Sequence, residues 1–220
     1  MRLSELYALR TGVAPLNERA CLLTVRDAGL LTVTSGQIEI ADPINFGAGF
    51  VTSIGAGAHP VRLTLADVSE GLDGSHLRVA YLSVCMRDDA PVSVEGVVPD
   101  GKPAPEPGMS YVVPVDCASV GVADAAEARR VSDLTYEETS DWFDNEVWAD
   151  RPYETTEDHV APHSVTLFDA RAGENYVICR SGWGDGSYSV FATRNADGDL
   201  CGVHVDFEVV YDRTADYDAI

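Results

Sequence analysis

The stretch SYSVFATRNADGDLCGVHVDF, residues 187–207, decides the fold. Its two outer runs alternate apolar and polar residues and are rich in β-branched and aromatic side chains, which is typical of half-buried strands. The segment NADGD between them, residues 195–199, favours a tight turn, because Asp-Gly adopts the positive φ angles of a hairpin. The same segment spaces Asn195, Asp197 and Asp199 like the ligands of a calcium loop, but it lacks that loop's glycine and distal glutamate at the required offsets. We therefore predict an antiparallel hairpin.

Similar short strands are expected along most of the chain. Nineteen glycines and 11 prolines divide it into short pieces, a spacing that favours strands over helices. The run HLRVAYLSVCM, residues 76–86, is nearly continuously apolar and is expected to be a central strand. Residues 124–150 are the exception, because they start with Asp124 as a helix N-cap and Glu127 three residues later, as in a capping box.

We predict a mainly β (α+β) fold, an antiparallel sandwich or partly open barrel with a helical insertion in the middle of the chain. The length of 220 residues fits a single domain. We expect an N-terminal extension (1–27), a β core (28–210) that carries the helical insertion (124–150), and a tail (211–220).

The charge balance limits the classes of partner that the protein can bind. Fifteen Lys and Arg residues face 36 Asp and Glu residues, which gives a formal net charge of −21. Such a surface repels phosphate backbones and anionic lipids, so we expect neither a nucleic acid nor a membrane partner. A basic protein is the partner that this charge would attract, although the charge also serves solubility. The oligomeric state is not indicated by the sequence.

The five cysteines indicate the compartment. They lie far apart, are odd in number and include no C-x-x-C pair, which is typical of a reducing environment. The N-terminus has no signal-peptide pattern, and no stretch approaches the roughly 20 apolar residues of a membrane span. We expect a cytoplasmic protein.

The segment SGWGDG, residues 181–186, is the most unusual in the chain, because glycines flank Trp183 on both sides. They allow positive φ or the close approach of another surface, and Asp185 before Gly186 is typical of a turn that leads into a strand. Trp183 then either seals the end of the β core or, with Tyr188, forms the floor of a ligand pocket.

Three aspartates follow or interrupt expected strands: Asp116, Asp185 and Asp206. If they converge, they form an acidic site for a cationic side chain or a divalent cation. His204 lies two residues before Asp206 in an alternating strand, so both face the same side, either as a catalytic pair or as a hydrogen-bonded structural pair. The chain has no motif of a nucleotide, zinc or serine-hydrolase site, and we predict no cofactor and no metal site.

Several blocks taken together resemble a bacterial family catalogued as domain of unknown function family 4241. The resemblance extends over residues 30–209 through GLLTVTSGQIEIADP, HPVRLTLADV, LRVAYLSV, YVVPVDCASVGVADAAEA and SGWGDGSYSVFATRNADGDLCGVHVDF. It aligns Asp42 and Pro43 with a D-P element, and Asp116 and Asp124 with the family's paired aspartates. His59 stands where the family usually has an aromatic residue. The resemblance implies a mainly β cytosolic bacterial protein and adds Asp42 to the candidate positions.

We therefore expect a binding or interaction protein, of the immunity- or inhibitor-like kind, for a basic protein partner. Its candidate binding residues are Asp42, Asp116, Trp183, Asp185, Tyr188 and Asp206. The alternative is a metal-dependent hydrolase-like enzyme that uses Asp116, Asp185 and Asp206 as ligands and His204 as base.

Overall fold

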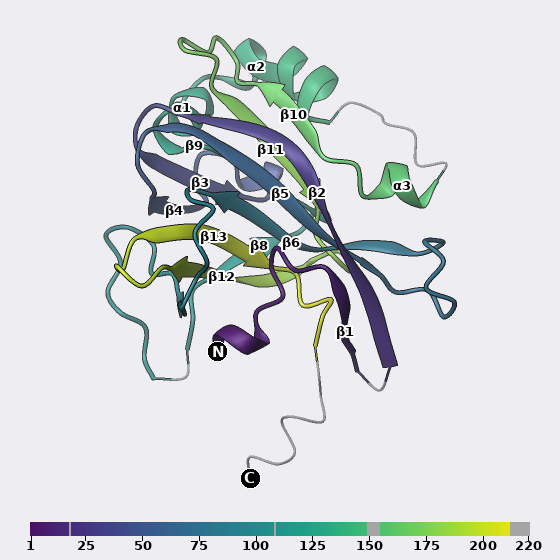
Figure 1. Ribbon diagram of the computed structural model, residues 1–220. Coiled ribbons are helices and arrows are strands. Elements are labelled where there is room, and N and C mark those ends of the chain that lie inside the picture. The colour runs from purple at the N-terminus through teal and green to yellow at the C-terminus, as the bar shows by residue number, and fades with distance from the viewer. Residues whose placement is uncertain (18, 108, 149–154, 212–220) are drawn as a thin grey trace.

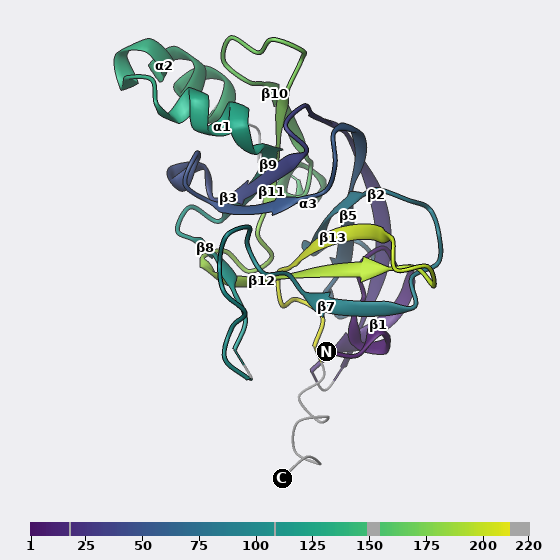
Figure 2. The same ribbon diagram turned by 90° about the vertical axis from the view of Figure 1, so that its left-hand side faces the viewer.

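Two antiparallel sheets, a larger one curled into a half-barrel and a smaller one packed against it, make up most of the structure (Figures 1 and 2). The computed structural model describes residues 1–17, 19–107, 109–148 and 155–211. The predicted mainly β fold with a helical region in mid-chain is confirmed. No helix in these residues is long and apolar enough to cross a membrane.

The larger sheet has the order β1-β2-β5-β6-β13-β12-β7, and β8 also pairs with β12. Its strands are β1 (Gly12–Leu16), β2 (Arg19–Val33), β5 (Gly57–Asp67), β6 (Leu77–Cys85), β13 (Leu200–Asp206), β12 (Gly186–Arg194), β7 (Ser93–Gly96) and β8 (Val112–Val115). The predicted central strand is β6, which lies between β5 and β13.

The smaller sheet has the order β10-β11-β9-β3-β4. Its strands are β10 (His163–Thr166), β11 (Asn175–Arg180), β9 (Ser119–Asp124), β3 (Gln37–Ala41) and β4 (Phe50–Ser53). The helical elements are α1 (Ala125–Ser132), α2 (Tyr136–Trp142), the π-helical turn η3 (Phe143–Val147), α3 (Thr156–His159), and the 3₁₀ turns η1 (Leu3–Glu5) and η2 (Pro43–Asn45).

Residues 187–207 lie in the β12–β13 hairpin, which runs from Ser189 opposite Asp206 to Arg194 opposite Leu200 with a register shift between Thr193 and Arg194. The Asn195 amide closes the turn on the Asp199 carbonyl at 3.0 Å, and the Asn195 Oδ1 atom accepts from the amide of Asp199 at 2.9 Å. The Asn195 side chain therefore serves the turn, which accounts for this segment without a cation.

The helical insertion starts at its predicted cap. Asp124 Oδ1 accepts from the amides of Ala126 and Glu127, both at 3.0 Å. The capping-box partner is not used in the predicted way, because the Glu127 carboxylate pairs with Arg130 at 2.6 Å instead. Helix α1, helix α2 and the π-helical turn follow in succession, and residues 149–150 of the predicted insertion lie outside the described residues.

The turn at Gly36 joins the two sheets and is not a hairpin. Strand β2 pairs with β5, whereas β3 pairs with β4 and β9. Gly36 has a φ of 81°, and the amides of Thr34 and Ser35 donate to Asp124 Oδ2 at 2.8 and 2.7 Å. The carboxylate that caps α1 thus also fixes the crossing point between the sheets.

The predicted N-terminal extension, 1–27, is shorter than expected. Strand β1 and the first half of β2 belong to the larger sheet, where Cys21 and Leu23 of β2 are buried. Their alternation with exposed residues is the strand pattern itself, so the sheet begins at Gly12. Of the predicted tail, Tyr211 is described and forms a bridge with Leu16, and residues 212–220 lie outside the described residues.

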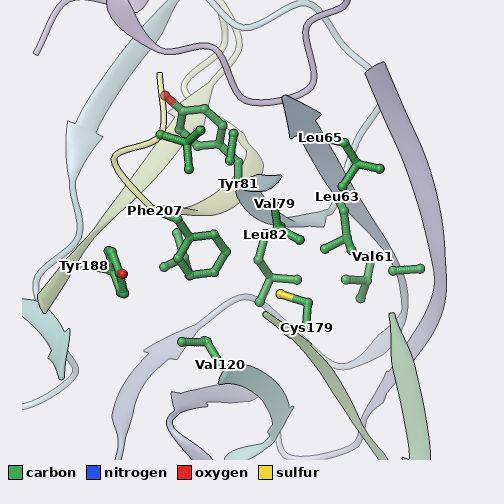
Figure 3. Packing of buried hydrophobic residues seen from close by; sticks show 14 of the residues in the cluster. Val61, Leu63, Leu65, Val79, Tyr81, Leu82, Val120, Cys179, Tyr188 and Phe207 are labelled. Carbon is green, nitrogen blue, oxygen red and sulfur yellow. The ribbon is translucent and has the colours of Figure 1, made fainter. Parts of the chain in front are cut away.

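The main core lies between the two sheets. Val61 and Leu82 of the larger sheet face Val120 and Cys179 of the smaller one, and all four side chains are buried (Figure 3). Each fully buried aliphatic side chain of this kind contributes about 1.5–3 kcal/mol. A second cluster around Trp142 lies beneath the helices. The five cysteines are free, as expected from their spacing.

A groove beside the Trp183 turn

The turn between β11 and β12 depends on its first glycine. Gly182 has a φ of 51°, and a Cβ atom there would lie 2.9 Å from atoms of Phe207 and Val209. The Gly184 amide closes the turn on the Ser181 carbonyl at 2.7 Å, and the Tyr188 hydroxyl donates to the Gly184 carbonyl at 2.7 Å. The turn is therefore held against the end of β13 from two sides.

Trp183 projects from this turn and is 51% exposed. The indole does not seal the core, which was one of the two predictions for it. The guanidinium carbon of Arg78 lies 5.0 Å from its ring centroid, and the His76 ring meets it edge-on at 6.1 Å. These contacts orient the ring while half of its surface stays open to solvent.

Tyr188 is the buried aromatic residue of the pair. It is 5% exposed and packs edge-on against Phe207 at 5.1 Å between ring centroids (Figure 3). Burial raises the pKa of its phenol. Tyr188 thus supports the turn from below, and the exposed aromatic surface comes from Trp183.

A groove of about 1140 Å³ runs beside this turn. The N-terminal segment forms one wall, and β12 with the end of β13 forms the other. Figure 1 shows the N-terminus on the same side of the molecule as β1. Four predicted site residues line the groove: Trp183, Asp185, Tyr188 and Asp206. The structure therefore brings together four of the six candidates.

The groove is acidic. Glu5 and Glu208, which the sequence analysis did not single out, line it together with Asp185 and Asp206. Arg2 is its basic lining residue, and the Arg2 guanidinium is bound to Glu5 at 2.7 Å. The lining therefore carries more negative than positive charge.

Asp206 is the one buried acid of this lining, with an exposure of 7%. Burial raises the pKa of its carboxyl to about 6, even though Oδ1 accepts from the Glu208 amide at 2.8 Å. Burial raises the pKa of the Tyr81 phenol, and the nearby Asp206 carboxyl raises it further. The Tyr81 hydroxyl makes no hydrogen bond within the described residues. An ionised Asp206 therefore lacks strong compensation, and a cation in the groove would supply it.

Asp42 and Asp116 lie outside the groove lining. Asp42 is fully buried, and its Oδ2 atom accepts from the amides of Asp116 and Cys117 at 2.6 and 2.9 Å. Its Oδ1 atom accepts from the Ile44 amide at 2.7 Å and from the Cys117 thiol at 2.9 Å. The Asp116 side chain is exposed. Asp42 is therefore a structural acid that joins two loops.

Asp185 connects that joint to the groove. Its Oδ1 atom accepts from the Ala118 amide at 2.9 Å, and Ala118 follows directly on Cys117, which is held by Asp42. The side chain of Asp185 remains exposed, so one carboxylate both fixes the loop and contributes charge to the groove.

The geometry does not support the metal-dependent alternative. Within the described ranges, no group of three or more His, Cys, Asp or Glu side chains could hold a metal ion. His204 is buried, and its ring nitrogens contact Ser83 Oγ at 2.9 Å and Thr193 Oγ1 at 3.0 Å. Burial lowers its pKa to about 4. His204 is thus a structural side chain whose ring nitrogens contact Ser83 and Thr193, not Asp206.

Sequence reasoning missed the N-terminal wall. Met1, Arg2, Glu5 and Tyr7 line the groove, although they are separated from Trp183 by most of the chain. The pairing of β1 with the sheet brings them there, and no local pattern indicates it. Glu208 lies two residues beyond Asp206, the last residue of β13, and this proximity was a usable signal.

Comparisons with known proteins agree with the resemblance inferred from the SGWGDG block. No curated protein and no solved structure matches the chain. Residues 31–205 match the model of the family described as "Protein of unknown function (DUF4241)". Because this match spans well over half of the 220 residues, the chain belongs to the DUF4241 family.

Proposed function

We propose that this protein is a bacterial cytoplasmic binding protein, of the immunity- or inhibitor-like kind, whose acidic groove takes a cationic side chain of a basic protein partner. One observation carries the proposal: a half-exposed indole and a buried, weakly compensated Asp206 line the same groove. An indole and a carboxylate in one groove favour a ligand with an ammonium or guanidinium group, because such a cation stacks on indole and pairs with carboxylates. The net charge of −21 would speed the encounter.

Fluorescence titration with an oligolysine peptide tests the proposal at low salt. We expect saturable binding with a change in tryptophan emission that Trp183→Phe removes, since Trp142 is buried and Trp148 is not part of the groove lining. The substitution Glu208→Gln should weaken binding by about threefold or more, the value of one well-placed charge.

The matched control removes the same charge from a distant surface. Glu137→Gln on α2 lies in the first turn of a helix that is remote from the groove lining, and it should leave the affinity nearly unchanged. If both substitutions weaken oligolysine equally, the peptide senses only the net charge, and the groove is not the site.

The protonation of Asp206 supplies a second test. A bound cation favours the carboxylate, so binding releases a proton where Asp206 is still protonated, and affinity should rise between about pH 5 and pH 7. Calorimetry in buffers of different ionisation enthalpy measures that proton. The substitution Asp206→Asn should remove this rise, and an unchanged pH profile in the variant would exclude Asp206 from binding.

A further inference from the structure

The groove beside the Trp183 turn is larger than one cationic side chain needs. Its volume is about 1140 Å³, whereas pockets that bury most of a drug-sized ligand measure about 300–1,000 Å³. Its lining comes from both ends of the chain, because the N-terminal segment faces β12 and the end of β13 across it. The groove therefore has room for a peptide segment.

Aromatic side chains line the groove on both walls. Tyr7 lies on the N-terminal wall, and Trp183 and Phe191 lie on the side of β12. These three side chains are at least partly exposed, whereas Tyr188 and Phe207 of the same lining are buried. The groove thus combines accessible aromatic rings with the acids described above.

One face of β12 adds hydrogen-bonding groups to these rings. Ser187, Ser189 and Phe191 share this face, because side chains alternate along a strand with a period of two residues, and all three line the groove. The indole N–H of Trp183 has no acceptor among the described residues, since the described contacts of this side chain are made by its ring. The groove therefore offers hydroxyl and indole donors beside aromatic rings.

The pairing of β12 limits the backbone conformation of a bound segment. From Ser189 to Arg194, β12 pairs with β13 on one side and with β8 and β7 on the other, so a peptide cannot add to it there as a further strand. An α-helix bonds its own carbonyls and would leave the donors of the groove without acceptors. A polyproline II segment has no internal hydrogen bonds and docks in aromatic-lined grooves. Polyproline II is therefore the conformation that this lining favours.

We propose that the ligand of the groove is a proline-rich segment of the partner that carries basic side chains and binds in the polyproline II conformation. Its proline rings pack on Trp183 and Phe191, and its basic side chains pair with Glu208 and Asp206. The inference rests on the function proposed above, because it keeps the cation at the acids of the groove and extends the ligand from one side chain to a segment. The negative charge of the lining selects basic segments among proline-rich ones.

Two labelled peptides of equal length and charge test the inference at low salt: three Lys-Pro-Pro repeats and three Lys-Gly-Gly repeats. The proline peptide adopts polyproline II before it binds, whereas the glycine peptide is a flexible chain with the same lysines. Fluorescence anisotropy of the peptides should show at least about tenfold tighter binding of the proline peptide, because less backbone entropy is lost on binding. Equal affinities would overturn the inference and leave the function proposed for the groove intact. Binding of neither peptide would overturn both.

Two variants separate the contribution of the rings from that of the charge. Trp183→Ala should reduce the preference for the proline peptide by at least about threefold, because an aromatic contact is lost. Glu208→Gln should weaken both peptides equally and keep the preference, and Glu137→Gln on the remote helix α2 should leave both affinities nearly unchanged. An unchanged preference in Trp183→Ala would overturn the assignment of the prolines to the indole. The comparison of the two peptides on wild-type protein decides the question even if Trp183→Ala folds poorly.

Discussion

Asp42 and Asp206 are both buried aspartates at the end of a β-strand, and they differ in how their charge is compensated. Asp42 is fully buried and accepts hydrogen bonds from three backbone amides and one thiol. Asp206 accepts from one amide, that of Glu208, and lies beside a Tyr81 hydroxyl that makes no hydrogen bond in the described part of the chain. The difference separates an acid that holds the fold together from an acid that is available to a ligand.

The comparison also explains why the two acids affect stability in opposite directions. Amide donors stabilise a buried carboxylate, whereas burial without enough donors destabilises it and raises its pKa. For Asp206 burial prevails. Substitutions at the two positions should therefore have opposite signs.

The largest effect is expected for Asp42→Ala. The change removes a fully buried carboxylate and leaves the part-buried amides of Ile44, Asp116 and Cys117 without their acceptor, which should lower the free energy of unfolding by about 3–5 kcal/mol. Urea denaturation followed by circular dichroism measures the loss. The control is Asp116→Ala, because the exposed Asp116 side chain should contribute about 0.5 kcal/mol or less. Similar losses in both variants would show that Asp42 does not join the loops.

Asp206→Asn should stabilise the protein at neutral and higher pH. Because the folded-state pKa is raised from 3.8 to about 6, the contribution of Asp206 to stability is fully present below the unfolded pKa and is lost as pH rises through about 6. The amide removes this loss and keeps the acceptor for Glu208. The shift corresponds to about 3 kcal/mol as an upper limit.

Thermal denaturation at about pH 4 and about pH 8 checks this sign, since the stabilisation should vanish at the lower pH. The matched control is Asp185→Asn, at an exposed acid of the same groove. A variant of Asp206 that is less stable than wild type at about pH 8 would place Asp206 with Asp42 as a structural acid.

The features that the sequence predicted correctly depend on neighbours along the chain. The hairpin around Asn195, the strand Leu77–Cys85 and the helix cap at Asp124 each depend on residues within a few positions. The difference between Asp42 and Asp206 could not be predicted, because it depends on distant segments. The amides of Asp116 and Cys117 donate to Asp42, whereas Tyr81, which lies opposite Asp206 in the sheet, makes no hydrogen bond within the described residues. For the same reason, the N-terminal wall of the groove had no signal in the sequence.

Gly182→Ala should affect stability through the turn that carries Trp183. The new Cβ would lie 2.9 Å from Phe207 and Val209 at a φ of 51°, so we expect a loss of about 1–3 kcal/mol. Gly198→Ala is the matched control, because Gly198 has a φ of 84° but no atom within 4 Å of its added Cβ. Gly198→Ala should therefore lower the free energy of unfolding only by the cost of a positive φ for alanine, about 1 kcal/mol. Equal losses would mean that the turn does not pack on the end of β13.

Trp183→Ala should have the smallest effect on stability and the largest on binding, in contrast to the buried Trp142. Trp183 is 51% exposed and contributes mainly its contact with Arg78, so its loss should cost about 1 kcal/mol or less. Trp142 is 8% exposed and donates through Nε1 to the Thr166 carbonyl at 2.8 Å, so Trp142→Ala should cost about 3–5 kcal/mol.

Oligolysine titration of a Trp183→Ala protein that remains folded then separates the role of the exposed indole in binding from its role in stability. Weaker binding at unchanged stability places the ring in the binding site, whereas unchanged binding would leave the acids of the groove to act without it.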